Sequence, residues 1–369
     1  MVKAVGVDPG THSFDFFGFD DQSGDVIIDS TLLSSEIAEK PESLVDMLTS
    51  VGPVDFIAGP SGYGLPLVKL DEASDWDLFQ TTLVRSEDLP KVPVLLGMQR
   101  AFRLLKKRKL PIWFIPGVIH LPTIPVHRKA NRIDMGTADK LCCAVLAVKD
   151  QTEHFNLRYA ETSFILAEVG YGYTAVLGVA DGKIVDGIGG SMGGPGFLTL
   201  GSLDGELAYL LGGFEKTLLF RGGAASMTGR DSMTPQQLMR LAKEKDPLAT
   251  QAWEALIESV VKGVAAMTVS VKKPREILLS GRLSRERRLR ETLEERLSGF
   301  APVRVVRRSA KVAKEAAEGG AILANGLAGG KFTELVDVME IRDAKGSVID
   351  HIFLREVEEL KRRYGASRS

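Results

Sequence analysis

Near the start of the chain, an apolar run reads as a strand, breaks at a polar turn and resumes as a second strand, over residues 5–19 (VGVDPGTHSFDFFGF). Asp8 stands where the run breaks, and the Pro-Gly pair after it lets the backbone reverse. Three residues can then present amide and hydroxyl donors to one point: Thr11, His12 and Ser13. Such a turn suits a phosphate, with Asp8 holding Mg²⁺ or its waters beside it. A plain β-hairpin with an Asx-type turn explains the same residues equally simply.

The same pattern recurs over residues 163–190. Each copy has an acid, a glycine two residues later and another glycine ten residues past the acid. These positions are Asp8, Gly10 and Gly18 in the first copy and Glu168, Gly170 and Gly178 in the second. Both copies then end in a polar turn, at residues 21–24 and 180–182. A repeat at this long period predicts two similar domains, because solenoid units are only about 20 to 50 residues long.

Between the two hairpins, the pattern predicts the elements of an α/β domain. We expect helices at 36–50 and 99–109, and strands at 54–58 and from Ile112 onward. Residues 59–62 follow a strand, where open α/β sheets place ligands, although a structural turn is as good an interpretation. Residues 70–93 have few periodic apolar positions and are predicted to be irregular. The polar residues 151–160 are predicted to join the two halves.

After the second hairpin, 10 of the 28 residues from 186 to 213 are glycine. So many glycines cost backbone entropy, which favours a substrate or phosphate loop over the alternative, close packing against a helix. The remaining expectations are helices at 203–211, at 249–271, at 310–327 and after the N-cap Thr234, a strand at 302–308, and a charged C-terminal helix. For residues 335–353 the pattern leaves a hairpin and a helix pair open.

Composition adds exclusions. The chain has 369 residues, enough for two to three domains, with 44% apolar and 26% charged residues and a net charge of −1. This balance implies no general attraction to nucleic acid or to a membrane. The basic segment 99–109 also lacks the interleaved aromatic residues that base stacking needs. No apolar run approaches the ~18 residues of a membrane span and no signal-peptide pattern is present, so we expect a cytoplasmic protein.

The cysteines and histidines do not suggest a metal site. Cys142 and Cys143 are neighbours in an apolar helical run, where adjacent side chains point about 100° apart, and we expect both in the core. His120 and His127 are seven residues apart with prolines between them. That spacing excludes the pair of histidines on one helical face that holds a metal in some enzymes.

Two such hairpins, one in each half, resemble the superfamily of acetate and sugar kinases, actin and ATP-dependent chaperones. The resemblance covers almost the whole chain. It implies an α/β protein of two similar actin-like (ribonuclease H-like) domains, each a mixed sheet with flanking helices, around an interdomain nucleotide cleft. The expected division is 1–150 and 151–332, with a C-terminal extension at 333–369.

Further segments carry the same resemblance. Residues 275–297 resemble the superfamily's adenosine-binding element, a strand, a turn at Ser280, Gly281 and Arg282, and then a charged helix. The small-residue segments 136–148 and 318–330 resemble the two helices that link the halves. Together these elements are closely similar to an uncharacterised archaeal family of predicted butyrate kinases.

The resemblance implies ATP and Mg²⁺ as cofactors and assigns candidate residues. Asp8 is expected in the Mg²⁺ shell, and Glu168, Asp8 and Asp139 in catalysis. The expected nucleotide contacts are Gly10, Thr11, His12, Ser13, Gly170, Gly172, Thr174, Ser280, Gly281, Arg282 and Gly319. The superfamily usually has Asp where this chain has Glu168, and Tyr171 and Tyr173 are bulky for a phosphate turn, so the second hairpin departs further from the superfamily's pattern than the first.

The acceptor is expected to be a small carboxylate, converted to an acyl phosphate. An anionic acceptor needs a cation beside the γ-phosphate, for which Arg128, Arg132 and Arg282 are candidates, although surface arginines explain Arg128 and Arg132 as well. Gly193 and Gly194 are expected in an acceptor-side loop. The alternatives are a kinase of another small metabolite, an ATPase that activates a partner protein, and a nucleotide-free scaffold. We expect a small-molecule acid substrate and no nucleic-acid or membrane partner, and both a monomer and a homodimer are left open.

Overall fold

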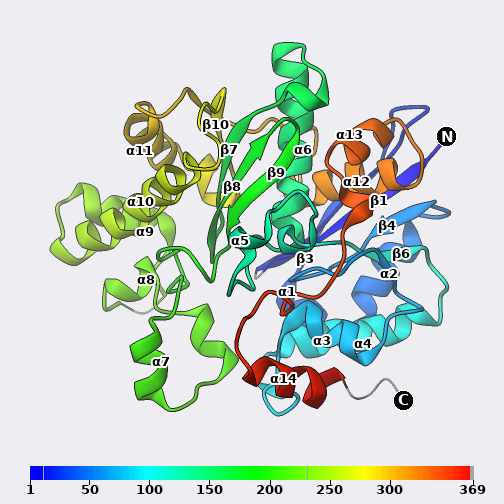
Figure 1. Ribbon diagram of the computed structural model, residues 1–369, viewed down its shortest axis with the longest axis horizontal. Coiled ribbons are helices and arrows are strands. Elements are labelled where there is room, and N and C mark those ends of the chain that lie inside the picture. The colour runs from blue at the N-terminus through cyan, green and yellow to red at the C-terminus, as the bar shows by residue number, and fades with distance from the viewer. Residues whose placement is uncertain (11, 231, 366–369) are drawn as a thin grey trace.

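The computed structural model describes residues 1–10, 12–230 and 232–365, which form two α/β halves on either side of a central pair of helices (Figure 1). The first sheet has the strand order β3-β2-β1-β4-β6-β5. Its strands are β1 (Lys3–Pro9), β2 (Ser13–Asp20), β3 (Val26–Leu33), β4 (Phe56–Ala58), β5 (Val68–Lys69) and β6 (Ile112–Phe114). β1, β2 and β3 run antiparallel, whereas β4 and β6 continue the sheet parallel to β1.

The second sheet repeats this topology. Its order is β11-β10-β7-β8-β9, with an antiparallel meander of β7, β8 and β9 followed by two parallel strands. The strands are β7 (Phe164–Val169), β8 (Thr174–Ala180), β9 (Lys183–Ile188), β10 (Glu276–Ser280) and β11 (Val303–Val305). The α/β fold class with two mixed sheets, which the resemblance to the kinase and actin superfamily implied, is confirmed.

The two hairpins agree in their backbone details as well as in sequence. In the first turn the amide of Gly10 donates to the carbonyl of Ser13 at 3.0 Å, and in the second the amide of Gly170 donates to Tyr173 at 2.9 Å. The register of the strand pair that follows shifts after Gly18 in one half and after Gly178 in the other. A shift of this kind marks a β-bulge, which increases the local twist of a sheet. The glycines that revealed the repeat therefore mark the same bend in both sheets.

The helices α6 (Ala138–Phe155) and α12 (Glu315–Leu327) pack against each other at the centre of the molecule. Each covers the sheet of the other half, since α6 contacts β7 and β8 whereas α12 contacts β1, β2 and β4. Their small residues permit this close approach: a Cβ added to Gly319 would overlap the carbonyl oxygen of Cys142. Both cysteines are buried and unbridged in this core, as expected. Gly319, expected to contact adenosine, is instead a helix-packing residue.

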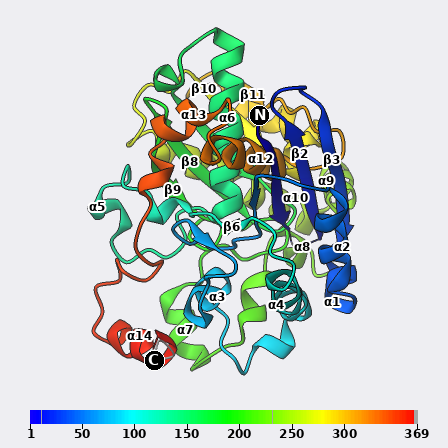
Figure 2. The same cartoon turned by 90° about the vertical axis from the view of Figure 1, so that its right-hand side faces the viewer.

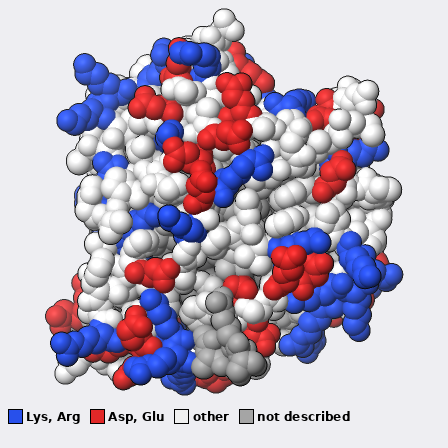
Figure 3. Space-filling view, turned by 45° about the vertical axis from the view of Figure 1, so that its right-hand side comes forward, with Lys and Arg blue, Asp and Glu red and all other residues white. Residues whose placement is uncertain are grey.

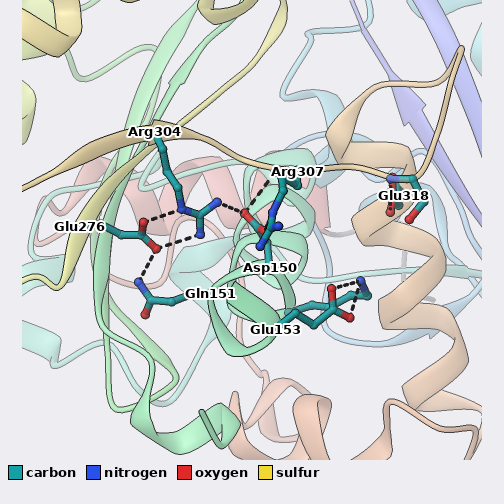
Figure 4. A network of polar contacts seen from close by, with 9 residues as sticks. Asp150, Gln151, Glu153, Glu276, Arg304, Arg307 and Glu318 are labelled. Atoms are coloured by element: carbon teal, nitrogen blue, oxygen red, sulfur yellow. Dashed lines mark hydrogen bonds and ion pairs between the residues drawn. The ribbon is translucent and has the colours of Figure 1, made fainter. Parts of the chain in front are cut away.

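The segment 151–155 continues α6 and is not the polar linker that we predicted. Figure 4 shows what holds this part of α6: Gln151, together with Asp150 just before it, belongs to a buried network of polar side chains that ties α6 to the second sheet. Gln151 donates to Glu276 at 2.7 Å, and Arg304 binds Glu276 at 2.5 Å and also Asp150. Arg307 reaches Asp150 at 3.0 Å. The network fixes the C-terminal part of α6, whereas Asp139 stands at the N-terminal end of this helix.

The first half is completed by helices around its sheet, in which α4 packs on α1 and α2. They are α1 (Ser34–Glu39), α2 (Glu42–Ser50), α3 (Asp75–Thr82), α4 (Pro93–Lys106) and α5 (Val126–Lys129), with 3₁₀ turns η1 (Leu89–Lys91) and η2 (Val118–His120). The prediction of an irregular 70–93 is wrong for α3. Ser74 and Asp77 form a capping box there, a local signal that was overlooked, and Trp76 is buried.

In the second half the long helix α10 covers one face of the sheet, where it contacts β7, β8 and β9. The helices of this half are α7 (Gly205–Leu211), α8 (Ala224–Met227), α9 (Pro235–Lys243), α10 (Pro247–Met267) and α11 (Arg287–Leu297), with 3₁₀ turns η3 (Tyr159–Glu161), η4 (Lys216–Phe220) and η5 (Arg282–Arg285). The capping box at Thr234 is confirmed.

The C-terminal segment packs on both the centre and the first half. It contains α13 (Thr333–Val338), η6 (Ile341–Asp343) and α14 (Glu356–Gly365), and no strand lies within 335–353. Leu335 and Ile349 are buried in the central core, and Tyr364 of α14 stacks on Phe79 of α3 with ring centroids 4.4 Å apart. Figure 2 shows α14 beneath α3. The domain boundaries at 150 and 332 stay a prediction, since both linking helices cross between the halves.

No helix within the described ranges is both long and apolar enough to cross a membrane. The face drawn in Figure 3 carries lysine and arginine in patches interrupted by acidic residues, rather than as one continuous basic surface. This mixed surface agrees with the net charge of −1.

Candidate active site

A cleft of about 400 Å³ lies between the two halves, at the N-terminal ends of α6 and α12. This volume is within the range of about 300–1,000 Å³ that is typical of ligand sites. The first hairpin turn contributes Gly10 and His12, and the second contributes Gly170, Tyr171, Gly172 and Tyr173. The turns face each other, with the rings of His12 and Tyr171 centred 6.2 Å apart. Because helix N-termini carry partial positive charge, both linking helices favour an anion in this space.

Lys314 connects the first hairpin to α12. Its Nζ lies 2.6 Å from Asp15 and 3.5 Å from Asp8, directly beside Gly10. The loop that precedes Lys314 is held in turn by Asp29 on β3, whose carboxylate accepts the backbone amides of residues 311–313 at 2.6 to 3.1 Å. The strand β3 therefore determines where this lysine meets the acid of the first turn.

Lys140, at the start of α6, makes the corresponding connection to the second hairpin. Its Nζ lies 2.6 Å from Asp139 and 2.9 Å from Glu168. Asp139 also accepts a hydrogen bond from the hydroxyl of Thr137. Each hairpin acid thus has a lysine from the helix that covers its own sheet, Lys314 for Asp8 and Lys140 for Glu168.

The cluster contains more acid than base. Burial raises the pKa of Asp8 to about 6 and that of Glu168 to about 7, and the lysines only partly offset this. Burial also acts on Asp139, but there Lys140 outweighs it and the pKa of Asp139 is lowered. The pKa values of Lys140 and Lys314 are raised, because their acidic neighbours outweigh the cost of burial. The acid without sufficient compensation is therefore Glu168, followed by Asp8.

This surplus of negative charge fits a divalent cation. Within the described ranges, no three His, Cys, Asp or Glu side chains converge as a ready metal cage. Mg²⁺ does not need one, because it keeps several waters and usually takes one or two carboxylates together with phosphate oxygens. Asp8 lines the cleft beside the first turn and is the carboxylate that fits this role.

The third side of the cleft is the turn after β10. Gly281 has φ of +86°, a conformation that side chains other than glycine rarely adopt, and a Cβ there would overlap Glu168. Arg282 follows and places its guanidinium 5.6 Å from the centre of the Tyr171 ring. Ser280 is buried behind the turn, and its hydroxyl has no partner in the described part of the chain. The strand, turn and charged helix expected here are confirmed as secondary structure.

The remaining wall of the cleft is less polar and contains a third lysine. Lys216 of η4 lies over the ring of Tyr63, 5.1 Å from its centre, with Nζ 3.4 Å from the Tyr63 hydroxyl. Asp134 lies nearby, where it accepts from the amide and hydroxyl of Ser191 at 2.9 Å. Apolar side chains complete this wall: Phe14, Val92, Val94, Leu95, Met98, Ile115 and Phe220.

Most of the residues predicted from sequence meet at this cleft. It is lined by Asp8, Gly10, His12, Asp139, Glu168, Gly170, Gly172, Gly281 and Arg282. Thr11 lies outside the described residues. Ser13 does not line the cleft, and its hydroxyl donates to Asp15 at 3.0 Å.

Other predicted residues lie elsewhere. Arg128 donates to the carbonyl of Val185, away from the cleft, and Arg132 is not part of the lining either. Thr174, Gly193 and Gly194 line a separate cavity between the glycine-rich segment and α10. The prediction that Gly193 and Gly194 face the acceptor is therefore not supported, because their open side is directed at α10: a Cβ on Gly194 would meet Ser259 at 2.6 Å.

Sequence reasoning missed the three lysines of the cleft. Lys140 and Lys314 each stand at the start of a small-residue helix, where a basic residue is unfavourable for the helix dipole, and that anomaly was the available signal. Lys216 is the first residue of the short 3₁₀ turn η4, and no pattern in the sequence distinguishes it from a surface lysine.

Comparison with known proteins supports this architecture. The family described as "Protein of unknown function (DUF1464)" matches residues 6–354. Among curated proteins, none matches the chain significantly. A solved propionate kinase from Francisella tularensis subsp. tularensis SCHU S4 aligns with a TM-score of 0.59 and 15% identity, covering 85% of this chain and 99% of that one.

Two acetate kinases align in a similar way. The enzyme from Entamoeba histolytica has a TM-score of 0.58 at 13% identity, with 80% of this chain and 86% of that chain covered. The Porphyromonas gingivalis enzyme has a TM-score of 0.55 at 15% identity, with 81% and 88% covered. At these identities the likeness establishes the fold, which is the actin-like fold expected from the paired hairpins.

Proposed function

Because this chain belongs to the DUF1464 family of proteins of unknown function, its activity must be inferred from its own site, and we propose that it is an ATP-dependent phosphotransferase that acts on a small carboxylate. The observation that carries the proposal is the pair of hairpin turns. They share one hydrogen-bond pattern and face each other across a single cleft, with the rings of His12 and Tyr171 6.2 Å apart. Two matched amide-bearing turns on opposite domains suit a polyphosphate bound between them.

In this proposal the nucleotide lies beside the third turn. Gly281 lets the backbone of this turn pass directly against Glu168 at the edge of the cleft, and Arg282 supplies a positive charge at the second hairpin. With the phosphates between the turns, Lys140 and Lys314 would offset their charge from the two helix ends. Mg²⁺, held by Asp8 and water, would supply further charge neutralisation.

The acids have separate roles in this account. Asp139 is kept ionised by Lys140, so it suits the orientation of a water or an acceptor by accepting a hydrogen bond. Glu168, with a pKa of about 7, is able to hold or release a proton near neutral pH. Because phosphoryl transfer depends chiefly on positioning and charge, these residues need not form any covalent bond.

A carboxylate acceptor, as in a butyrate kinase, is supported by the wall opposite the acids. That wall combines apolar side chains with Lys216, and among the described residues the lining of the cleft includes no Asn or Gln side chain that would bind the hydroxyls of a sugar. The structural neighbours include enzymes described as propionate and acetate kinases. The product would be an acyl phosphate.

One observation favours a second candidate, a kinase with a hydroxyl acceptor. A carboxylate is already nucleophilic, whereas a hydroxyl must lose a proton, and Glu168, which lines the cleft and has a pKa of about 7, is a suitable general base. The two candidates predict different products, which chemical trapping separates.

The test is phosphorylation in the presence of hydroxylamine, which converts acyl phosphates to hydroxamates. Purified protein would be incubated with Mg-ATP and each of acetate, propionate, butyrate and hexanoate, with glycerol and hexoses as hydroxyl acceptors. We expect ADP release matched by hydroxamate for at least one acid. Phosphorylation of a hydroxyl acceptor with no hydroxamate from any acid would contradict the carboxylate proposal and favour the second candidate.

A further inference from the structure

Lys216 reaches the cleft on a segment of the second half that extends to the first half. The segment leaves the glycine-rich region, forms α7 and then η4, and in Figure 1 α7 lies well below the second sheet. Lys216 is in η4, yet its closest aromatic and hydroxyl contact is Tyr63 of the first half. Its side chain therefore spans the boundary between the two halves.

Contacts at the rim hold this segment in place. Lys91 of η1 pairs with Glu215 at 2.7 Å, and Arg85 donates to the carbonyl of Phe214 at 3.3 Å. Both contacts join the first half to the residues directly before Lys216. The pair between Lys91 and Glu215 also brings their chain neighbours, Val92 and Lys216, to the same end of the cleft.

Lys216 differs from the other two lysines of the cleft in having no acidic partner. Lys140 and Lys314 are each engaged by two carboxylates, whereas the described residues place no carboxylate within ion-pair distance of Lys216. Asp134 is the acid whose charge acts on the pKa of Lys216, but the carboxylate oxygens of Asp134 already accept hydrogen bonds from Ser191 and from the amide of Gly136. Burial lowers the pKa of Lys216 to about 8, which reflects this shortage of compensating charge.

The surface beside Lys216 is apolar and is built from the start of α4. Val92, Val94, Leu95 and Met98 contribute from the first half and Phe220 contributes from the second. An ammonium group that has no carboxylate partner among the described residues and lies next to an aliphatic surface is complementary to a molecule with a carboxylate at one end and a hydrocarbon tail at the other. It is poorly matched to a sugar, whose hydroxyls would leave the apolar wall uncovered.

We propose that Lys216 binds the carboxylate of the acceptor and that the wall from Val92 to Met98 houses its tail, so that the substrate is an aliphatic monocarboxylate with a tail longer than the methyl group of acetate. This inference rests on the proposed phosphotransferase function and specifies its acceptor. It assigns specificity to η4 and α4, and not to Arg128, Arg132 or the loop at Gly193.

The experiment compares three substitutions by steady-state kinetics with the acid series and Mg-ATP. Lys216→Met keeps the side chain's length without its charge, and Lys216→Arg keeps the charge. Losing a hydrogen bond to a charged group typically costs about 10- to 100-fold in affinity. We expect Lys216→Met to raise KM for butyrate by that factor with KM for Mg-ATP nearly unchanged, and Lys216→Arg to restore most of the loss. Leu95→Trp, whose larger side chain would occupy the space beside the apolar wall, should lower kcat/KM for the longer acids relative to that for acetate.

Lys262→Met, on an exposed position of α10, is the control for removal of a lysine. The proposed phosphotransferase function and the acceptor assignment to Lys216 are contradicted by different results. If wild-type protein gives no hydroxamate with any acid, the proposed function is contradicted and the acceptor assignment with it. If wild-type protein is active but Lys216→Met retains its KM for the acids, or Leu95→Trp keeps the order of preference, the acceptor assignment alone is overturned.

Discussion

At the scale of single residues, Glu168 bears most of the electrostatic cost of the cleft. It is buried beside Lys140, but that lysine is already balanced by Asp139, so burial raises the pKa of Glu168 to about 7. An acid whose pKa is higher in the folded state than in the unfolded state, here about 7 against 4.5, stabilises the fold below pH 4.5. That contribution is lost as the pH rises through about 7.

Glu168→Gln should therefore separate stability from activity. The glutamine removes the cost of a buried charge, so at pH 8 without nucleotide the variant should be more stable by up to about 3 kcal/mol, from about 1.4 kcal/mol per pKa unit. Its phosphoryl transfer should fall by about 10²- to 10³-fold, as is typical when a positioned polar group is lost. Urea unfolding between pH 4 and 8 and turnover assays measure the two effects. A loss of activity below about threefold would mean that Glu168 is structural.

The sequence identified Asp8 and Glu168 because their positions depend on local turn chemistry that repeats in both halves. Lys314 was not identified, because its role depends on packing of α12 against a hairpin some three hundred residues earlier and on Asp29 of β3. The arginines chosen for the acceptor were near a linking helix in sequence, but Arg128 turns toward β9 instead. Proximity along the chain is a weak guide to which side chains enter a cleft between domains.

At the scale of elements, the position of α6 depends on the buried ion network at its C-terminal end. Arg304 lies between Glu276 and Asp150, both of which are buried. Removing one partner of a buried ion pair leaves an uncompensated charge, which typically costs about 3–5 kcal/mol.

Arg304→Met should therefore destabilise the protein by about 3 kcal/mol in urea unfolding. Arg307→Met is the matched control, because Arg307 also pairs with Asp150 but is 62% exposed, and its loss should cost less than about 1 kcal/mol. Equal effects for the two substitutions would show that the network does not depend on Arg304.

The end of α6 accounts for one error of prediction. Residues 151–155 have the composition of a polar linker because only Gln151 enters the buried network, whereas residues 153–155 are exposed on the last turn of the helix. The helix α3 was missed for a different reason: its capping box is a local signal that the apolar periodicity of so short a helix did not support. Long elements with glycine-marked bends, such as β1 with β2 and β7 with β8, were found at once.

At the scale of the whole molecule, the duplication was predictable because the second half repeats the spacing of the first at three marked positions. The exchange of linking helices between sheets was not predictable from pattern alone, since it depends on the contact of Gly319 with Cys142. As a consequence, a ligand that binds to both hairpins also contacts the N-terminal ends of both linking helices, because all four line the same cleft.

Nucleotide binding should therefore close the cleft. Small-angle scattering with a non-hydrolysable ATP analogue and Mg²⁺ should give a smaller radius of gyration than the protein alone, because neither hairpin alone encloses a triphosphate. An unchanged radius would contradict closure, provided that the free protein is not already as compact as the complex; crosslinking between cysteines introduced at Lys91 and Glu215 measures that state independently.

The central claim is that the two hairpins bind one Mg-ATP, with Asp8 at the metal. Isothermal titration calorimetry of Mg-ATP into the wild-type protein and into Asp8→Asn tests it most directly, with EDTA titrations of both proteins for comparison. We predict one site per chain in the wild type, tight only when Mg²⁺ is present, and an Asp8→Asn protein that is folded but has lost most of this metal dependence. Absence of binding, or the same affinity in both proteins with and without Mg²⁺, would contradict the account.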